Sequence, residues 1–126
     1  MCINRFSKKK ILMRTLGCLF SFFLFLGGNC FYQMKQSPPI SIPASSRDIY
    51  FFYRDDCPDC QSVFPLIYGE KLLGKEIQWV NLNQTFNRQY IRKYGLKQVP
   101  TLLKNSKKET STNWQKIQLF IEKNSE

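Results

Sequence analysis

Two cysteines stand three positions apart in the stretch YFFYRDDCPDCQSVFP, residues 50–65. Cys57 and Cys60 follow an apolar run and a pair of aspartates. Thiols at this spacing can exchange disulfides with other proteins, supply half of a metal site, or stay closed as a structural disulfide. We take them as the candidate catalytic residues, with all three chemistries open on spacing alone.

The composition excludes several other kinds of chemistry. The 126-residue chain contains no histidine, which excludes Ser-His and Cys-His catalysis and any zinc site that uses imidazole. The other cysteines, Cys2, Cys18 and Cys30, lie far upstream and form no second CxxC pair that could complete a four-thiolate zinc site. We therefore predict no metal and no cofactor. Carriage of copper(I) by the two thiolates stays a further hypothesis.

The first third of the chain resembles a membrane-insertion signal. No charged residue occurs from Thr15 to Tyr32, and a helix of that length covers about 27 Å, close to the hydrocarbon thickness of a bilayer. We predict an N-terminal signal-anchor or transmembrane helix within residues 1–32. The alternatives are a signal peptide that is cleaved, for which the ending LGGNCF lacks the usual small residues, and lipidation of Cys30.

The distribution of charge predicts the orientation of that helix. The charged residues before the uncharged stretch, Arg5, Lys8, Lys9, Lys10 and Arg14, are all basic, and a positive flank stays in the cytoplasm. The remainder of the chain is then extracytoplasmic. The net charge of +10 includes this basic flank, and no basic tract with interleaved aromatic residues follows it, so we expect no nucleic-acid partner.

The stretch QMKQSPPISIPASS, residues 33–46, has the proline-rich composition of a linker. Extended backbone of this length would hold a domain up to roughly 40 Å from the bilayer. The domain itself is predicted over residues 47–126.

Residues 47–126 alternate between strand and helix patterns. Strands are predicted at 47–53, 75–83 and 99–104, with a weak fourth strand after them, and helices begin at Pro58, 87 and 113. Cys57 suits the N-cap of the first of these helices and Pro58 its first position. The predicted core side chains are Val63, Phe64, Leu66, Ile67, Ile77, Trp79, Val80, Trp114, Ile117, Phe120 and Ile121. This order predicts an α/β domain with a right-handed crossover between parallel strands.

CPDC at the head of a helix, Pro65 within that helix, and KYGLKQVPTLL at 93–103 together resemble the thioredoxin superfamily. The resemblance covers most of residues 47–126. It implies a trimmed thioredoxin fold, with a central mixed sheet and flanking helices. It also implies a cis peptide bond between Val99 and Pro100, beside the cysteines.

The helix terminus gives the two cysteines different roles. Unpaired N–H groups and the positive end of the helix dipole stabilise a thiolate at Cys57, which becomes the nucleophile, whereas Cys60 is shielded one turn inside and becomes the resolving thiol. The resemblance implies that Val99, Pro100 and Thr101 form a substrate groove, in which the backbone of Val99 pairs with an extended peptide.

Several residues depart from the superfamily pattern. Phe51 stands where a buried carboxylate often assists proton transfer, and Asp56 stands where an aromatic residue is usual. Pro58 and Asp59 occupy the positions between the cysteines. Because negative charge disfavours the thiolate, Asp55, Asp56 and Asp59 favour a reductant or isomerase over an oxidant.

The combined prediction is a membrane-anchored, extracytoplasmic thiol-disulfide oxidoreductase. Its partners would be exported proteins that contain cysteine, and a membrane electron carrier that recharges it. Small anchored proteins of this kind include bacteriocin transport accessory proteins, to which the chain is similar at the family level. A non-enzymatic thioredoxin-like binding or assembly factor, with Cys57 and Cys60 closed as a disulfide, is the alternative.

Overall fold

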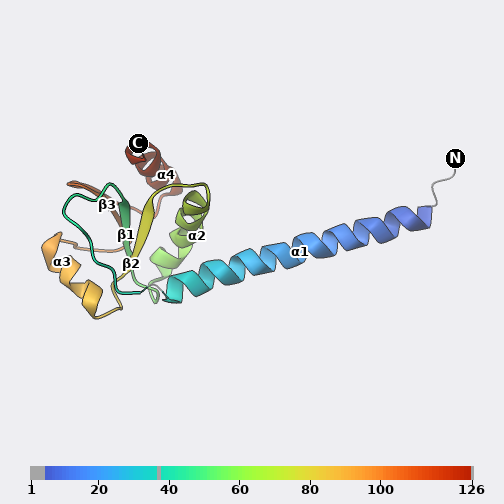
Figure 1. Ribbon diagram of the computed structural model, residues 1–126, viewed down its shortest axis with the longest axis horizontal. Helices are drawn as coiled ribbons and strands as arrows, with labels where there is room; N and C mark the ends of the chain where they lie inside the picture. Colours follow the sequence, from blue (N-terminus) through green and yellow to red (C-terminus); the bar gives the residue numbers. More distant parts are fainter. Residues whose placement is uncertain (1–4, 37, 126) are drawn as a thin grey trace. The chain divides into compact units, whose positions relative to one another are not determined.

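The computed structural model describes residues 5–36 and 38–125. The chain divides into two compact units between Tyr32 and Gln33. The first unit holds most of one long helix, and the second holds the sheet and the shorter helices (Figure 1).

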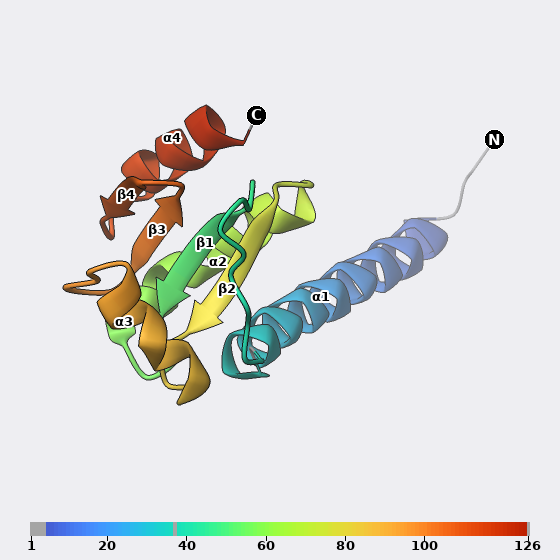
Figure 2. The same cartoon turned by 60° about the vertical axis from the view of Figure 1, so that its left-hand side comes forward.

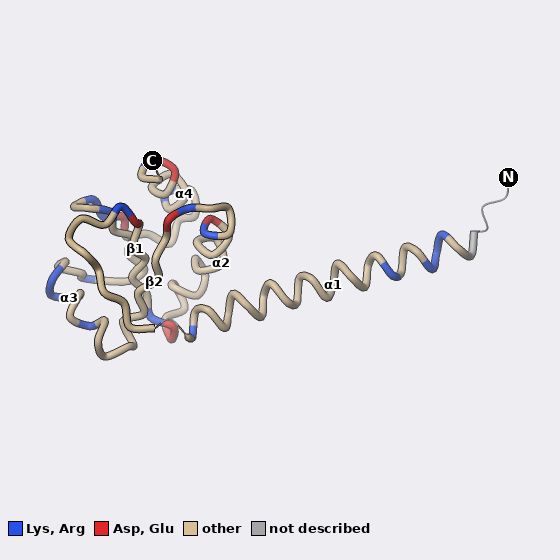
Figure 3. The backbone as a smooth tube through the Cα atoms, in the orientation of Figure 1, with Lys and Arg blue, Asp and Glu red and all other residues tan. Residues whose placement is uncertain are grey.

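Helix α1, Arg5–Gln36, carries no charged residue between Thr15 and Tyr32. Its large side chains are exposed, with Phe20, Phe23 and Phe25 each about two-thirds accessible. Lysine and arginine gather near its N-terminus, as Figure 3 shows. Among the described residues, Ser7–Gln36 is the one segment long and apolar enough to cross a membrane, with a mean hydropathy of 1.8. Such a helix suits a membrane anchor or a signal sequence.

The second unit is built on a mixed four-stranded sheet, which confirms the predicted α/β class. The strands are β1 (Ile49–Tyr53), β2 (Ile77–Asn81), β3 (Thr101–Lys104) and β4 (Lys107–Thr110), in the order β2-β1-β3-β4. β1 pairs parallel with β2 and antiparallel with β3, and β3 pairs antiparallel with β4. All five residues of β1 are buried, as expected for an apolar central strand that is covered on both faces.

Four helical segments accompany the sheet. They are α2 (Pro58–Leu72), the 3₁₀ turn η1 (Phe86–Arg88), α3 (Gln89–Lys93) and α4 (Trp114–Asn124). Figures 1 and 2 show α2 and α3 on opposite faces of the sheet. Gly95 follows α3 with a positive φ of 58°, which fits the predicted glycine stop of that helix.

Alternate residues of β1 build two aromatic clusters. On one face Phe51 stacks on Tyr53 at 5.2 Å, and both rings meet Phe64 of α2. On the other face Phe52 packs against Tyr90 and Tyr94. The period of two in the strand therefore fixes α2 on one side and α3 on the other.

The prediction that Trp114 belongs to the core is wrong. Ile117 and Ile121 of α4 are fully buried, and Phe120 is half-buried beside them, but the side chain of Trp114 is 53% exposed. α4 begins at Trp114, behind the N-cap Asn113, so the buried stripe starts one turn further into the helix. Leu66 and Trp79 are half-buried, and the other predicted core positions are buried.

The prediction of an extended spacer at 33–46 is also wrong where the structure describes it, and Ser37 lies outside the described residues. Residues 33–36 continue α1. Ile42 is buried, and Ile40 packs beside it against the cluster around Phe52. The Tyr90 hydroxyl donates to the Ile40 carbonyl at 2.7 Å and accepts from the Ile42 amide at 3.1 Å. The two isoleucines make this segment part of the folded unit, because their burial outweighs the preference of prolines for free extended chain.

Candidate functional site

Cys57 is the N-cap of α2, as the sequence predicts. Its backbone is extended, with φ −93° and ψ 118°, and Pro58 follows at the first helical position. The Cys57 sulfur accepts a hydrogen bond from the Cys60 amide at 3.4 Å. A half-exposed sulfur at this place receives an N–H that the helix leaves unpaired and faces the positive end of the helix dipole. Both features hold the sulfur at the exposed start of the helix.

Cys60 lies one turn further along and has no exposed surface. Burial raises the pKa of the Cys60 thiol from 9.0 to about 12, against a hydrogen bond with the Arg54 backbone that lowers it. Phe51, at the position where the sequence analysis notes a missing carboxylate, is also fully buried. Cys60 is therefore a protonated thiol that external reagents do not reach.

Asn83, just after β2, binds the loop between β1 and α2 through hydrogen bonds. The Asn83 side-chain amide donates to carboxylate oxygens of Asp55 and of Asp56, the latter at 3.0 Å. Its carbonyl oxygen accepts from Nε of Arg54 at 3.1 Å. The side chain of Gln61 holds the same loop from the helix side, by donating to the Asp55 carbonyl at 2.9 Å. These hydrogen bonds fix the approach to Cys57.

The two aspartates of that loop are each matched by a cation. Asp55 lies 3.2 Å from Nζ of Lys35, and Asp56 lies 2.9 Å from the guanidinium of Arg54. Partial burial opposes ionisation of Asp55, but hydrogen bonds from Asn83 and Lys35 outweigh it and hold its pKa below the usual value. The hydrogen bond from Asn83, aided by Arg54, likewise lowers the pKa of Asp56. The negative charge beside Cys57 is thus smaller than the sequence alone indicates.

Asp59, in the first turn of α2, differs from that pair. It takes part in no ion pair among the described residues, and its backbone carbonyl accepts from the Ser62 hydroxyl at 2.7 Å. Pro58 and Asp59 are both exposed at the end of the helix. Of the three carboxylates near the cysteines, Asp59 is therefore the one whose charge is not balanced by a neighbouring cation.

The last turn of α1 contacts the same loop; we call this contact the Lys35 clasp. Nζ of Lys35 bonds the side chain of Asp55 and also its carbonyl, at 3.4 Å. The Tyr53 hydroxyl donates to the backbone carbonyl of Met34 at 2.7 Å, and Met34 is buried. The clasp joins residues 34 and 35 to the segment that leads into Cys57.

The predicted groove residues lie at the start of β3. Thr101 pairs with Phe52 in the antiparallel ladder, so Val99 and Pro100 come just beyond the end of β1. The Val99–Pro100 bond is cis, Pro100 and Thr101 are buried, and Val99 is half-buried. The Thr101 hydroxyl donates to the Gln98 carbonyl at 2.7 Å.

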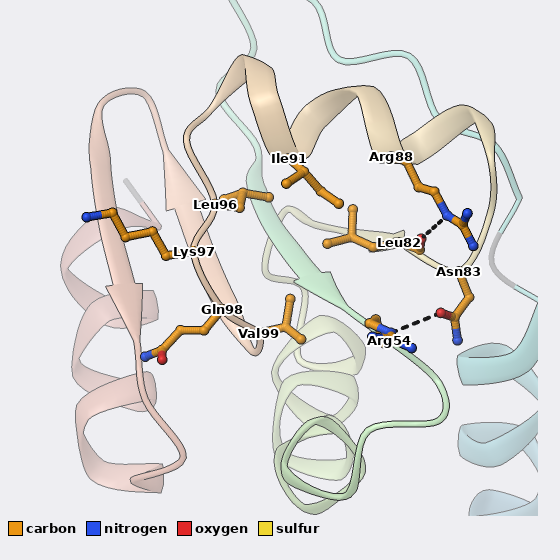
Figure 4. Close-up of a pocket in the computed structure, with 9 residues that line it drawn as sticks. All are labelled: Arg54, Leu82, Asn83, Arg88, Ile91, Leu96, Lys97, Gln98 and Val99. Atoms are coloured by element: carbon orange, nitrogen blue, oxygen red, sulfur yellow. Dashed lines mark hydrogen bonds between the residues drawn. The ribbon is translucent and has the colours of Figure 1, made fainter.

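A pocket of about 340 Å³ opens beside Val99, and Figure 4 shows its lining. The apolar lining residues are Leu82, Ile91, Leu96 and Val99. The polar ones are Arg54, Asn83, Arg88, Lys97 and Gln98. Of the predicted site residues, the lining includes Val99 but not Pro100, Thr101 or either cysteine. The structure therefore brings Val99 together with α3 and with the loop before Cys57.

The sequence analysis missed Asn83 and Arg88. The sequence does carry a signal for Asn83, because a polar residue shortly after a parallel strand lies at the carboxyl edge of the sheet, where loops meet. Arg88 has none, since it is one of many basic residues and only the fold places it beside Val99.

Among the described residues, no group of three or more His, Cys, Asp or Glu side chains could hold a metal ion. Comparison of the chain with protein-family models and with curated proteins finds no match.

Proposed function

We propose that this protein is a thiol-disulfide oxidoreductase of thioredoxin fold, which acts through Cys57 and Cys60 on cysteines of other proteins. One observation carries the proposal: a half-exposed thiol caps a helix and accepts a backbone N–H, while its partner three residues on is fully buried. A structural disulfide needs no such asymmetry, whereas a nucleophile with a resolving thiol does.

The proposed reaction transfers two electrons. The Cys57 thiolate attacks one sulfur of a client disulfide, forms a mixed disulfide and releases the other client sulfur as a thiol. Cys60 then loses its proton and attacks the Cys57 sulfur, which closes the Cys57–Cys60 disulfide and frees the reduced client. A dithiol partner must reduce the pair before the next cycle. Since the pKa of Cys60 is raised to about 12, the second step is the slower one unless the client thiolate accepts its proton.

The proposed direction is reduction or isomerisation. Strong oxidants stabilise the thiolate form of the first cysteine, and Asp59 opposes this without a neutralising cation, in a chain that has no histidine. Asp55 and Asp56 contribute less, because Lys35 and Arg54 balance them. Replacement of Asp59 by His should make the reduction potential more oxidising.

The proposed location is the outer side of a cytoplasmic membrane, with α1 as an uncleaved anchor. The basic residues before the uncharged stretch support this orientation. A membrane electron carrier would then recharge the pair. In intact cells whose outer barrier is absent or opened, a thiol reagent that cannot cross membranes should label reduced Cys57. Labelling that requires lysis of the cytoplasmic membrane would place the domain on the other side.

An insulin-reduction assay with dithiothreitol tests the activity on the full chain in detergent. The wild type should accelerate precipitation of the insulin B chain, and Cys57→Ser should not. Catalysis by wild type and Cys57→Ser alike would end the proposal. No catalysis by the wild type, with the pair still closed under dithiothreitol, would favour the alternative of a non-enzymatic binding or assembly factor.

A further inference from the structure

The proposed reaction at Cys57 and Cys60 assigns no role to the pocket beside Val99. Figure 4 shows its four apolar side chains, from Leu82, Ile91, Leu96 and Val99, gathered around one hollow. They come from three separate segments: the end of β2, α3 with the turn after it, and the residue before Pro100. A hollow of about 340 Å³ with such walls fits an apolar side chain of a bound peptide.

The charged residues that line this pocket are all basic. Its lining includes Arg54, Arg88 and Lys97 and no aspartate or glutamate. Arg54 is already paired with Asp56, and Figure 4 shows Lys97 directed away from the hollow. Arg88 is the cation that remains at the pocket.

Arg88 is also oriented by the fold. Its Nε donates to the Leu82 carbonyl at 3.3 Å, which holds the guanidinium at the edge of the hollow (Figure 4). Within the described part of the chain Arg88 forms no ion pair. A guanidinium held in this way can bind a carboxylate through two parallel N–H groups.

The pocket adjoins the loop that leads into Cys57, because Arg54 of that loop lines it. Arg54 is three residues before Cys57, and Val99 is two residues before Thr101, which pairs with the end of β1. An extended segment that contacts the backbone at Val99 would therefore place one side chain in the hollow and the side chain two residues along beside Arg88, because residues i and i+2 of a strand lie on the same face.

We infer that this pocket selects client segments in which an acidic residue and an apolar residue lie close to the reactive cysteine, and that Arg88 is the specificity-determining residue. The inference rests on the proposed thiol exchange at Cys57 for its biological meaning. The binding it describes does not require that exchange.

A binding experiment tests the inference without any redox step. Fluorescent peptides that share one apolar residue, and carry serine in place of cysteine, are made with flanking aspartates or with flanking lysines. Their affinity for the full chain in uncharged maltoside micelles is measured by anisotropy. The wild type should bind the acidic peptide at least about tenfold more tightly, a difference of about 1.4 kcal/mol.

Variants of α3 and η1 separate the local contact from the general charge of the protein. Arg88→Glu should remove the preference, and Arg88→Lys should keep most of it. Arg92→Glu changes the net charge equally, but Arg92 is exposed and does not line this pocket. The Arg92→Glu variant should therefore prefer the acidic peptide as strongly as the wild type does. Unchanged unfolding midpoints verify that each variant is folded. Equal binding of the two peptides, or an equal loss in Arg92→Glu, overturns the inference.

A second measurement separates this inference from the proposed function. The neutral reagent 2-hydroxyethyl disulfide carries no side chain for the pocket, so the wild type and the control Arg92→Glu should reduce it at the same rate. Failure of both to reduce it contradicts the proposed function. Normal reduction together with equal kcat/KM for acidic and basic cysteine peptides contradicts only the role of Arg88.

Discussion

The start of α2 and its first buried turn differ in almost every physical property, although one helical turn contains both. At the start, Cys57 is half-exposed behind a loop held by polar contacts to Asn83. One turn on, Cys60 is fully buried on the same helix as Phe64, whose ring packs against Phe51 and Tyr53. The comparison teaches that polar contacts hold the exposed cysteine in place while apolar packing shields the buried one.

The largest effect, on thiol exchange with client proteins, should come from replacing each of the two cysteines by serine. Cys57→Ser should abolish thiol exchange, because the only exposed sulfur of the pair is lost. Cys60→Ser should keep the first step and accumulate mixed disulfides through Cys57, since nothing resolves them. Non-reducing gels and mass spectrometry of peptide-mapped cysteines measure both results. Equal trapping by the two variants would show that burial does not divide their roles.

The next effect concerns the buried turn. Phe64→Ala should lower the free energy of unfolding by about 3–5 kcal/mol, because the ring is fully packed against Phe51, Tyr53 and Trp79. Ser62→Ala, on the exposed side of the same helix, is the matched control and should cost less than about 1 kcal/mol. Urea unfolding of reduced protein measures both. A small cost for Phe64→Ala would mean that the shield around Cys60 is loose.

A smaller effect is expected at the polar end. Asn83→Ala removes hydrogen bonds to Arg54, Asp55 and Asp56 and should cost about 1–2 kcal/mol of unfolding free energy. The loop should also become more open to proteolysis. Gln84→Ala is the control, because the Gln84 side chain makes no hydrogen bond within the described residues. Equal costs for the two variants would remove Asn83 from its structural role.

The smallest effect is a pH dependence of stability from Cys60. In the unfolded chain its thiol loses a proton above about pH 9, while in the folded protein burial keeps the proton until about pH 12. The folded state therefore binds more protons between these values, and the unfolding free energy falls as the pH rises above 9. Below pH 9 this group contributes no slope.

This dependence is measured by urea unfolding of reduced protein at about pH 8 and about pH 10. Other groups titrate in the same range, so the quantity to compare is the difference between wild type and Cys60→Ala. The wild type should lose more stability than the variant. Equal losses would show that Cys60 is more accessible to solvent than its burial indicates.

The sequence predicted those features that depend on local patterns. Cys57 and Pro58 mark the start of α2, and the apolar run before them marks β1, because capping and strand burial act over a few residues. The cis bond before Pro100 came from the family resemblance, not from a local pattern. These predictions are confirmed by the structure.

Features that depend on packing between distant segments were not predicted. Proline-rich composition gave no indication that Ile40 and Ile42 pack near Tyr90, which lies almost fifty residues away. The periodicity of α4 placed Trp114 on the buried stripe but did not show that burial begins only at Ile117. The pairing of Asp55 with Lys35 likewise depends on a contact across twenty residues, so the charge around Cys57 could not be read from the local sequence.

The Lys35 clasp also sets the route by which a mechanical pull would reach Cys57. Lys35 and Asp55 are twenty residues apart in the chain, but their side chains are joined directly, and Asp55 is two residues from Cys57. A force on the chain at Gln33 would therefore load the segment before Cys57 first, and the intervening residues would bear tension only after the clasp had opened.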